Sequence, residues 1–318
     1  MKKNIAIRVD ADRNIGLGHL IRVKGFIFRN LNQYKNFLLI TTADTKIIKK
    51  YISHKKIKFF FIKHKGIKQK ELIYKILLKN NTQILLSDFS YGNYLKSKSF
   101  FRNFYLYFKE KKILCVSIDD PRQSLSSDLA IIPYPINKNF LNIESGTKVI
   151  KGIKYIPFNI DLFKKKKKIN DRLQNILIVL SGFDYKNQTL NILKLILKKN
   201  FKINLKVTCN PKLKKTLLVN KNNNYNLELI HKLQNINTLL DWADLLITGE
   251  GMLRFEAAVK GVPTIFFNTL DNSKKNLEII KNFTKTETAS FLNYNKINSK
   301  SFFNLLNDFF KKNYLRKK

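Results

Sequence analysis

The feature that most constrains the fold is a regular alternation of short apolar runs with longer amphipathic segments. Short runs rich in Ile, Val, Leu and Phe predict buried strands, and apolar residues spaced three or four apart predict helices. Strands that alternate with helices predict parallel βαβ units, and therefore an α/β fold. In the first half we expect strands at residues 5–9, 37–41, 58–62, 84–87, 113–118 and 129–132, and helices at 20–31, 68–78 and 94–109.

The alternation stops at a lysine-rich stretch and then starts again. A chain of 318 residues is long enough for two domains. We therefore expect two Rossmann-like domains, 1–160 and 172–318, joined by a linker over 161–171 and facing each other across a cleft. In the second half the expected strands are 175–180, 203–208, 227–230, 245–247 and 264–267, and the expected helices are 187–198, 235–241, 252–260, 273–283 and 300–310.

The chain is strongly basic, with a formal net charge of +39 and a pI near 10.1. The lysines are spread along its whole length among Asn, Ile and Phe, as an AT-rich genome would produce, rather than gathered in one arm. We interpret them as solvated faces and expect no specific nucleic-acid partner, although the charge would attract an anionic substrate. No window approaches 18 uncharged apolar residues, so no membrane span is expected, only weak contact with a membrane surface.

The cysteines and histidines do not have the spacing of a metal site. Cys115 and Cys209 lie in expected strands far apart, which is typical of buried free thiols in a reducing compartment. We expect a cytoplasmic monomer without metal or cofactor. The four histidines are His19, His54, His64 and His231.

The segment from Asp10 to Arg22 joins the first expected strand to the first expected helix. Its glycines allow a sharp turn, and the positive end of the helix attracts an anion there. His19 is the residue type best suited to move a proton near neutral pH, and Arg22 follows one turn later on the same helical face. The predicted catalytic residues are His19, Asp10 and Asp12, and the predicted substrate ligands here are Gly16, Gly18 and Arg22.

Two better-known nucleotide motifs do not fit this segment. It lacks the third glycine of a dinucleotide fingerprint, and no Gly-Lys-Ser/Thr sequence follows, which excludes a P-loop. A helix-capping loop with an incidental histidine is the purely structural alternative.

A second glycine-containing turn follows the expected strand at 245–247 and precedes a helix. Such a turn offers N–H groups to a phosphate. The carboxylate of Glu256, about one turn into the helix, is placed to accept hydrogen bonds from ribose hydroxyls. A structural βαβ turn is the alternative. The predicted ligands in this segment are Gly249, Glu250, Gly251, Met252 and Glu256.

Other polar residues also stand at the ends of expected strands. Ser181 and Gly182 open the second domain and would contact the nucleotide. Asp88 and Asp120 would bind sugar hydroxyls or assist His19, although an aspartate before a proline is as often a turn residue. The proton partner of His19 stays open among three candidates: Asp10, Asp12 and Asp88.

Together, these motifs resemble the UDP-sugar hydrolases of pseudaminic acid biosynthesis, which act on UDP-2,4-diacetamido-2,4,6-trideoxy-β-L-altropyranose. Residues 7–22 resemble the opening motif of that family, and residues 181–184 and 249–263 resemble the donor-binding motifs that it shares with GT-B glycosyltransferases. The resemblance implies a GT-B-like fold and a metal-independent hydrolase that releases UDP and free sugar. It also implies that His19 is catalytic and that Glu256 binds the ribose of UDP.

Two rival functions remain. A GT-B glycosyltransferase would pass the sugar from a UDP-sugar to an acceptor instead of to water. A nucleotide-sugar or nucleic-acid binder would have no catalytic step, and a nucleic-acid role would be marked by binding lost at high salt. Release of free sugar without an acceptor distinguishes the hydrolase from the transferase.

Overall fold

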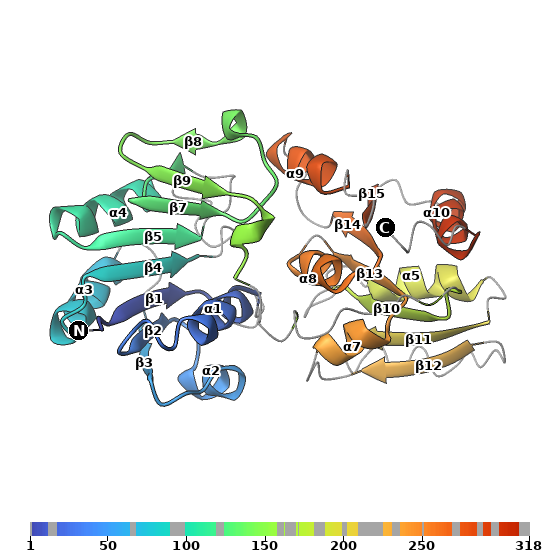
Figure 1. Cartoon of the computed structure of the whole chain (residues 1–318), viewed down its shortest axis with the longest axis horizontal. Helices are drawn as coiled ribbons and strands as arrows, with labels where there is room; N and C mark the ends of the chain where they lie inside the picture. Colours follow the sequence, from blue (N-terminus) through green and yellow to red (C-terminus); the bar gives the residue numbers. More distant parts are fainter. Residues whose placement is uncertain are drawn as a thin grey trace. The chain divides into compact units, whose positions relative to one another are not determined.

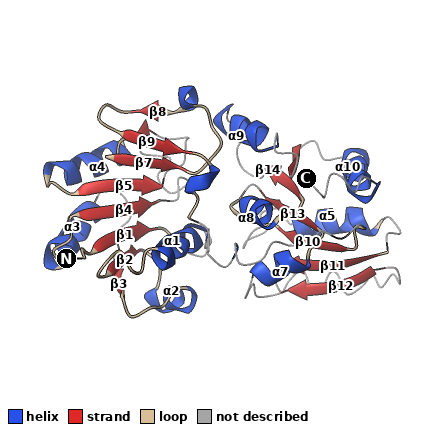
Figure 2. Ribbon diagram, in the orientation of Figure 1, coloured by secondary structure: helices blue, strands red, loops and turns tan. Residues whose placement is uncertain are grey.

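The computed structural model divides the chain into two compact units, Met1–Ile160 and Asp161–Lys318 (Figure 1). Both are α/β units with helices on the two faces of a sheet (Figure 2). The structure describes residues 2–11, 18–63, 68–89, 99–118, 124–157, 162, 170, 172–180, 188–198, 202–208, 225–230, 236–249, 251–268, 274–284, 289–293 and 299–311.

The described part of the first unit is built on a seven-stranded parallel sheet of order β3-β2-β1-β4-β5-β7-β9. Its central strands are fully buried and mostly apolar, as expected for a sheet covered on both faces. The strands are β1 (Ile5–Val9), β2 (Phe37–Thr41), β3 (Ile57–Phe61), β4 (Ile84–Asp88), β5 (Leu114–Ile118), β7 (Leu129–Ile132) and β9 (Lys148–Lys151), with a separate short pair, β6 (Ser124–Leu125) and β8 (Asn142–Ile143).

Helices cover both faces of this sheet because successive residues of each strand point to opposite sides. Ala6 of β1 packs in one core with α3 and α4. The buried face of α4 includes Phe104 and Phe108. Its neighbour Ile7 packs in the other core with Val23 and Ile27 of α1. The helices of this unit are α1 (Gly18–Arg29), α2 (Thr45–Tyr51), α3 (Gln69–Lys79) and α4 (Phe100–Glu110), with 3-10 turns at η2 (Lys138–Phe140) and η3 (Ile153–Tyr155).

The second unit repeats this architecture, with a described six-stranded parallel sheet of order β12-β11-β10-β13-β14-β15. Ile176 and Ile178 of β10 pack with α5 and α10 on one face. The strands are β10 (Asn175–Val179), β11 (Ile203–Thr208), β12 (Tyr225–Ile230), β13 (Leu245–Gly249), β14 (Thr264–Asn268) and β15 (Ala289–Asn293). The helices are α5 (Gln188–Leu197), α7 (Ile236–Trp242), α8 (Leu253–Lys260), α9 (Lys274–Thr284) and α10 (Ser299–Lys311).

The α/β fold with parallel sheets is thus confirmed, and the main differences are two edge strands and one short helix. The sequence did not predict β9, β15 or the short helix α2. The two strands lie at sheet edges, where burial is incomplete and the apolar pattern is weak: in β9 every described side chain is partly or fully exposed. The start of the expected helix at 94–109 lies outside the described residues, and α4 is described from Phe100.

Cys115 is a buried free thiol on β5, whereas Cys209 lies outside the described residues. Burial raises the pKa of the Cys115 thiol well above its usual range, so it is unreactive. Over the part of the chain that the structure describes, no helix is long and apolar enough to cross a membrane.

Candidate functional site

The candidate site in the first unit lies at the carboxyl ends of β1 and β4. These neighbouring strands pair in parallel with Val9 opposite Asp88, so both end at the same edge of the sheet. The Asp10 amide extends the pairing by donating to the Asp88 carbonyl oxygen at 3.2 Å. Figure 1 shows both arrowheads pointing toward the side where α1 begins. The residues that follow β1 and those at the end of β4 are therefore brought to the same edge of the sheet.

His19 and Asp88 are in direct contact at this edge. The Nδ1 atom of His19 lies 2.6 Å from Oδ1 of Asp88. The Asp88 side chain is fully buried, whereas the His19 side chain keeps 23% of its surface exposed. His19 is the second residue of α1, so the first turn of the helix holds its ring over the end of β4. Of the three partners that the sequence left open, the structure brings Asp88 to His19.

Arg22 donates hydrogen bonds to both oxygens of the same carboxylate. Its Nε donates to Asp88 Oδ2 at 2.7 Å, and its Nη2 donates to Oδ1 at 2.5 Å. Burial opposes the charge on Asp88, but the attraction of Arg22 and then of His19 outweighs it and holds the pKa of this carboxyl below its usual range. The pair likewise raises the pKa of Arg22, against the effect of its own burial. Asp88 is therefore an anion.

The charge on Asp88 determines which nitrogen of His19 carries the proton. An ionised carboxylate only accepts hydrogen bonds, so the 2.6 Å contact requires a proton on Nδ1. Arg22 Nη2 also lies 3.2 Å from Nδ1, but both atoms are then donors, and both are directed at Asp88. The neutral imidazole consequently carries its lone pair on Nε2, which has no hydrogen-bond partner among the described residues. Such a histidine can accept a proton from a substrate.

Asp10 lies nearby but is engaged with another partner. Its carboxylate Oδ1 accepts from Arg8 Nη2 at 2.7 Å, and both side chains are fully buried. Arg8 also donates to Gln69 Oε1 at 2.6 Å, and its guanidinium lies 5.0 Å from the centre of the Phe89 ring. The sequence predicted Asp10 as catalytic, and the structure places it in this buried ion pair beside the site.

Several predicted residues lie outside the described part of the chain: Asp12, Gly16, Asp120, Ser181, Gly182 and Glu250. Gly18 is described as the first residue of α1, and a Cβ added there would meet nothing within 4 Å. The packing of the described residues around Gly18 therefore leaves room for a side chain at this position.

The second predicted site lies in the other unit, at the end of β13. The sequence predicted that Gly249 belongs to the turn after the strand. In the structure Gly249 is instead the last residue of β13, and it is buried. Gly251 and Met252 precede α8, and the Met252 carbonyl accepts from the amides of Phe255 and Glu256 at 2.9 and 3.2 Å. The start of α8 thus presents a helix N-terminus at the carboxyl end of a parallel strand, a usual place for phosphate.

Two side chains in the first turns of α8 are partly or wholly buried. The Arg254 guanidinium packs against the rings of Phe255, Phe266 and Phe283, at 4.7, 4.9 and 5.5 Å from their centres. Glu256 is only partly covered, and no partner of its carboxylate is found among the described residues. Burial raises the pKa of Glu256 to about 7. A hydroxyl group that donated to this carboxylate would favour its charged form.

Tyr134, which no motif in the sequence predicted, is part of the first site. It follows β7 in the sequence Pro133-Tyr134-Pro135, and its hydroxyl accepts from Arg22 Nη1 at 3.4 Å. The only signal in the sequence was an aromatic residue between two prolines after a strand. The connection between Tyr134 and Arg22 depends on the strand order, in which β7 lies two strands from β4.

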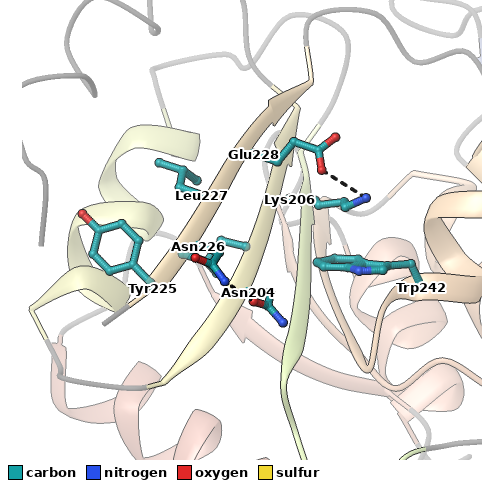
Figure 3. A pocket seen from close by; sticks show the side chains of 8 residues that line it. Asn204, Lys206, Tyr225, Asn226, Leu227, Glu228 and Trp242 are labelled. Atoms are coloured by element: carbon teal, nitrogen blue, oxygen red, sulfur yellow. Dashed lines mark hydrogen bonds and ion pairs between the residues drawn. The ribbon is translucent and has the colours of Figure 1, made fainter. Parts of the chain in front are cut away.

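A separate open pocket of about 510 Å³ lies on β11, β12 and α7 of the second unit (Figure 3). Lys206 crosses it, pairing with Glu228 at 3.1 Å and lying 4.7 Å from the centre of the Trp242 ring. None of its described lining residues belongs to either predicted site. The described residues also contain no group of three His, Cys, Asp or Glu side chains arranged to hold a metal ion.

Known structures show which class of fold this is. The chain superposes over 99% of its length on 92% of MurG from Acinetobacter baumannii, with a TM-score of 0.67 and 13% identity. It superposes over all of its length on 93% of the kitacinnamycin glycosyltransferase, with a TM-score of 0.68 and 10% identity. A UDP-GlcNAc 2-epimerase of Methanocaldococcus jannaschii, solved with UDP-GlcNAc and UDP, gives a TM-score of 0.58 and 17% identity over 98% of this chain and 93% of that one.

These neighbours give this chain the GT-B fold, with two Rossmann-like units, and confirm the predicted fold class. No family model matches the chain. Over 169 residues it is 27% identical to the uncharacterized protein MJ1062 of Methanocaldococcus jannaschii, which covers 49% of this chain. The chain spans about a third of that relative's length, since the match covers 35% of it. The neighbours named here include a glycosyltransferase and a UDP-GlcNAc 2-epimerase.

Proposed function

We propose that this chain binds a UDP-sugar and breaks the bond between the anomeric carbon and UDP, transferring the sugar to an acceptor hydroxyl. The observation that carries the proposal is the 2.6 Å contact between His19 Nδ1 and Asp88 Oδ1, which leaves Nε2 as a base at the end of a parallel sheet. Neighbours solved with UDP or UDP-GlcNAc support the class of substrate. Glycosyltransferases of the same fold support transfer.

The proposed step balances as a displacement at the anomeric carbon. His19 Nε2 takes the proton of the attacking hydroxyl while its oxygen bonds to the anomeric carbon. Asp88 stabilises the imidazolium that forms, because it already holds the Nδ1 proton. The bond to the UDP oxygen breaks, and UDP leaves with the electron pair. The N-terminus of α8 near Gly251 and Met252 would stabilise the phosphate charge, and Glu256 would bind the ribose.

Hydrolysis is the second candidate. Water would take the place of the acceptor hydroxyl, and no other role in the scheme would change. The observation in its favour is the segment from Asp10 to Arg22, which resembles the opening motif of the UDP-sugar hydrolases. Its substrate would then be a UDP-linked diacetamido-trideoxy sugar.

The test is a panel of UDP-sugars that includes UDP-GlcNAc and UDP-diacetamido-trideoxyhexoses, incubated with and without candidate acceptors. UDP release and sugar products are identified by NMR. Release of UDP only with an acceptor supports transfer, whereas release with free sugar in water supports hydrolysis. Formation of a C2 epimer with no new glycoside contradicts both.

His19→Gln should lower UDP release by about 10²-fold or more while UDP still binds, because the base is removed and the phosphate site is not. His54→Gln is the matched control. His54 lies before β3, and its Nδ1 accepts from the Lys56 amide at 3.2 Å, away from the carboxyl ends of β1 and β4. Equal activity of wild type and His19→Gln would overturn the proposal.

A further inference from the structure

Arg22 connects two parts of the first unit that are distant in sequence. Two of its guanidinium nitrogens donate to Asp88 on β4, and its Nη1 donates to the Tyr134 hydroxyl beyond β7. The Arg22 side chain is only 6% exposed. The sequence suggested that Arg22 binds substrate, but each of these donors is directed at an acceptor of the protein.

The segment that carries Tyr134 is itself held firmly. The Ile136 amide donates to the Tyr134 carbonyl at 3.0 Å, and Lys151 Nζ donates to the Ile136 carbonyl at 2.9 Å. The flanking Pro133 and Pro135 each have a restricted φ angle. The backbone that carries Tyr134 is therefore held in place by the end of β7 and by Lys151 of the neighbouring β9.

We propose that Arg22 is a positioning residue, anchored by Tyr134, which keeps the Asp88 carboxylate directed at His19 Nδ1. A planar guanidinium that contacts both oxygens prevents the carboxylate from turning, whereas a lysine ammonium would act as a point charge without that control. With Asp88 fixed, the proton of the neutral His19 stays on Nδ1 and the lone pair stays on Nε2. The catalytic consequence rests on the proposed function, but the tautomer is a property of the free protein.

The direct test is the ¹⁵N NMR spectrum of histidine-labelled protein without substrate, in which the shifts of Nδ1 and Nε2 report the tautomer. The chain has only four histidines, so His19 is assigned by comparison with His19→Gln. Wild type should show a protonated Nδ1, and Arg22→Lys should show a mixture of the two tautomers. An unchanged protonated Nδ1 in Arg22→Lys would overturn the proposal.

Tyr134→Phe provides a second variant, because it keeps the ring and leaves the Arg22–Asp88 pair intact. It should shift His19 toward the same mixture, although less than Arg22→Lys does. If His19 in Tyr134→Phe matches wild type, Tyr134 is not the anchor. Matched controls are Arg102→Lys, an exposed arginine on α4, and Tyr155→Phe, a partly exposed tyrosine of η3.

Kinetics separate positioning from substrate binding. If Arg22 positions His19, Arg22→Lys should lower kcat by about 10-fold or more and leave the Kd for UDP within about twofold of wild type. A loss expressed mainly in Kd or KM would assign Arg22 to the substrate and overturn the proposal. If no UDP-sugar is turned over at all, the proposed function fails while the NMR result still decides the role of Arg22.

Discussion

Nδ1 of His19 lies 2.6 Å from Oδ1 of Asp88, a residue 69 positions later in the chain. The two meet because β1 and β4 are neighbours in a parallel sheet, and α1 returns His19 over the end of β4. The same carboxylate holds Arg22, so one buried anion organises a partly exposed histidine and a buried arginine. Variants of these residues separate the chemical role of this cluster from its structural role.

Asp88→Asn should reduce UDP-sugar turnover by about 10²–10⁴-fold, because an amide no longer fixes the proton on His19 Nδ1. It should also lower the free energy of unfolding by about 3–5 kcal/mol, since the buried Arg22 loses its counter-ion. Steady-state kinetics and urea unfolding measure the two effects. Glu144→Gln is the control, because it changes a carboxylate to an amide in a partly exposed pair with Arg102 at 3.6 Å. A folded Asp88→Asn protein with normal turnover would contradict the scheme.

The stability from Asp88 should depend on pH in a defined direction. Its pKa is depressed in the folded state, so its contribution is fully present above the unfolded value of about 3.9 and is lost as pH falls through the lower folded value. Urea midpoints of wild type and Asp88→Asn should therefore differ by a constant amount from pH 8 to 5 and converge below about pH 4. A difference that persists unchanged to pH 3 would argue against the ion pair.

Glu256 should show the opposite dependence. Burial raises its pKa to about 7, so its contribution to stability is fully present below the unfolded value of about 4.3 and is lost as pH rises through 7. Glu256→Gln should match wild type in stability near pH 4 and exceed it at pH 8, by on the order of 1 kcal/mol for a partly exposed side chain. Glu228→Gln, an exposed carboxylate of the second unit, should show no such trend. Unfolding curves at both pH values measure this.

UDP binding tests the proposed role of the same side chain. If Glu256 accepts from ribose hydroxyls, Glu256→Gln should weaken UDP binding by about 10-fold, the usual cost of losing hydrogen bonds to a charged acceptor. Its effect on the chemical step should be smaller than that of His19→Gln. Calorimetry with UDP measures the affinity, and unchanged affinity would remove Glu256 from the nucleotide site.

Asp10→Asn distinguishes a structural aspartate from a catalytic one. Because Asp10 and Arg8 form a fully buried pair, the variant should lose about 3–5 kcal/mol of stability. The kcat of the protein that remains folded should stay within about threefold of wild type, since Asp88 still holds His19. Urea unfolding and active-site-normalised kinetics measure the two effects. A large loss of kcat in a fully folded variant would restore Asp10 to the catalytic group.

Local patterns in the sequence were enough to predict the strands at the centres of both sheets. The expected strands at 5–9, 37–41 and 203–208 coincide with β1, β2 and β11. β1 and β2 are fully buried and mostly apolar, whereas β11 alternates buried apolar residues with partly exposed ones, and both patterns are typical of strands. Edge strands such as β9 and β15 have no such pattern. The helices that follow the two glycine-containing turns were also predicted within one or two residues, since caps and apolar periodicity are local properties.

What the sequence determined by itself is therefore the α/β class, the parallel alternation and the place of His19 at the start of the helix that follows the first strand. Only the tertiary structure decided that Asp88 is the partner of His19, that Asp10 belongs to Arg8, and that Arg22 and Tyr134 meet. The physical reason is that strand order and register set which side chains meet across the sheet. Neither is encoded within any single stretch of the chain.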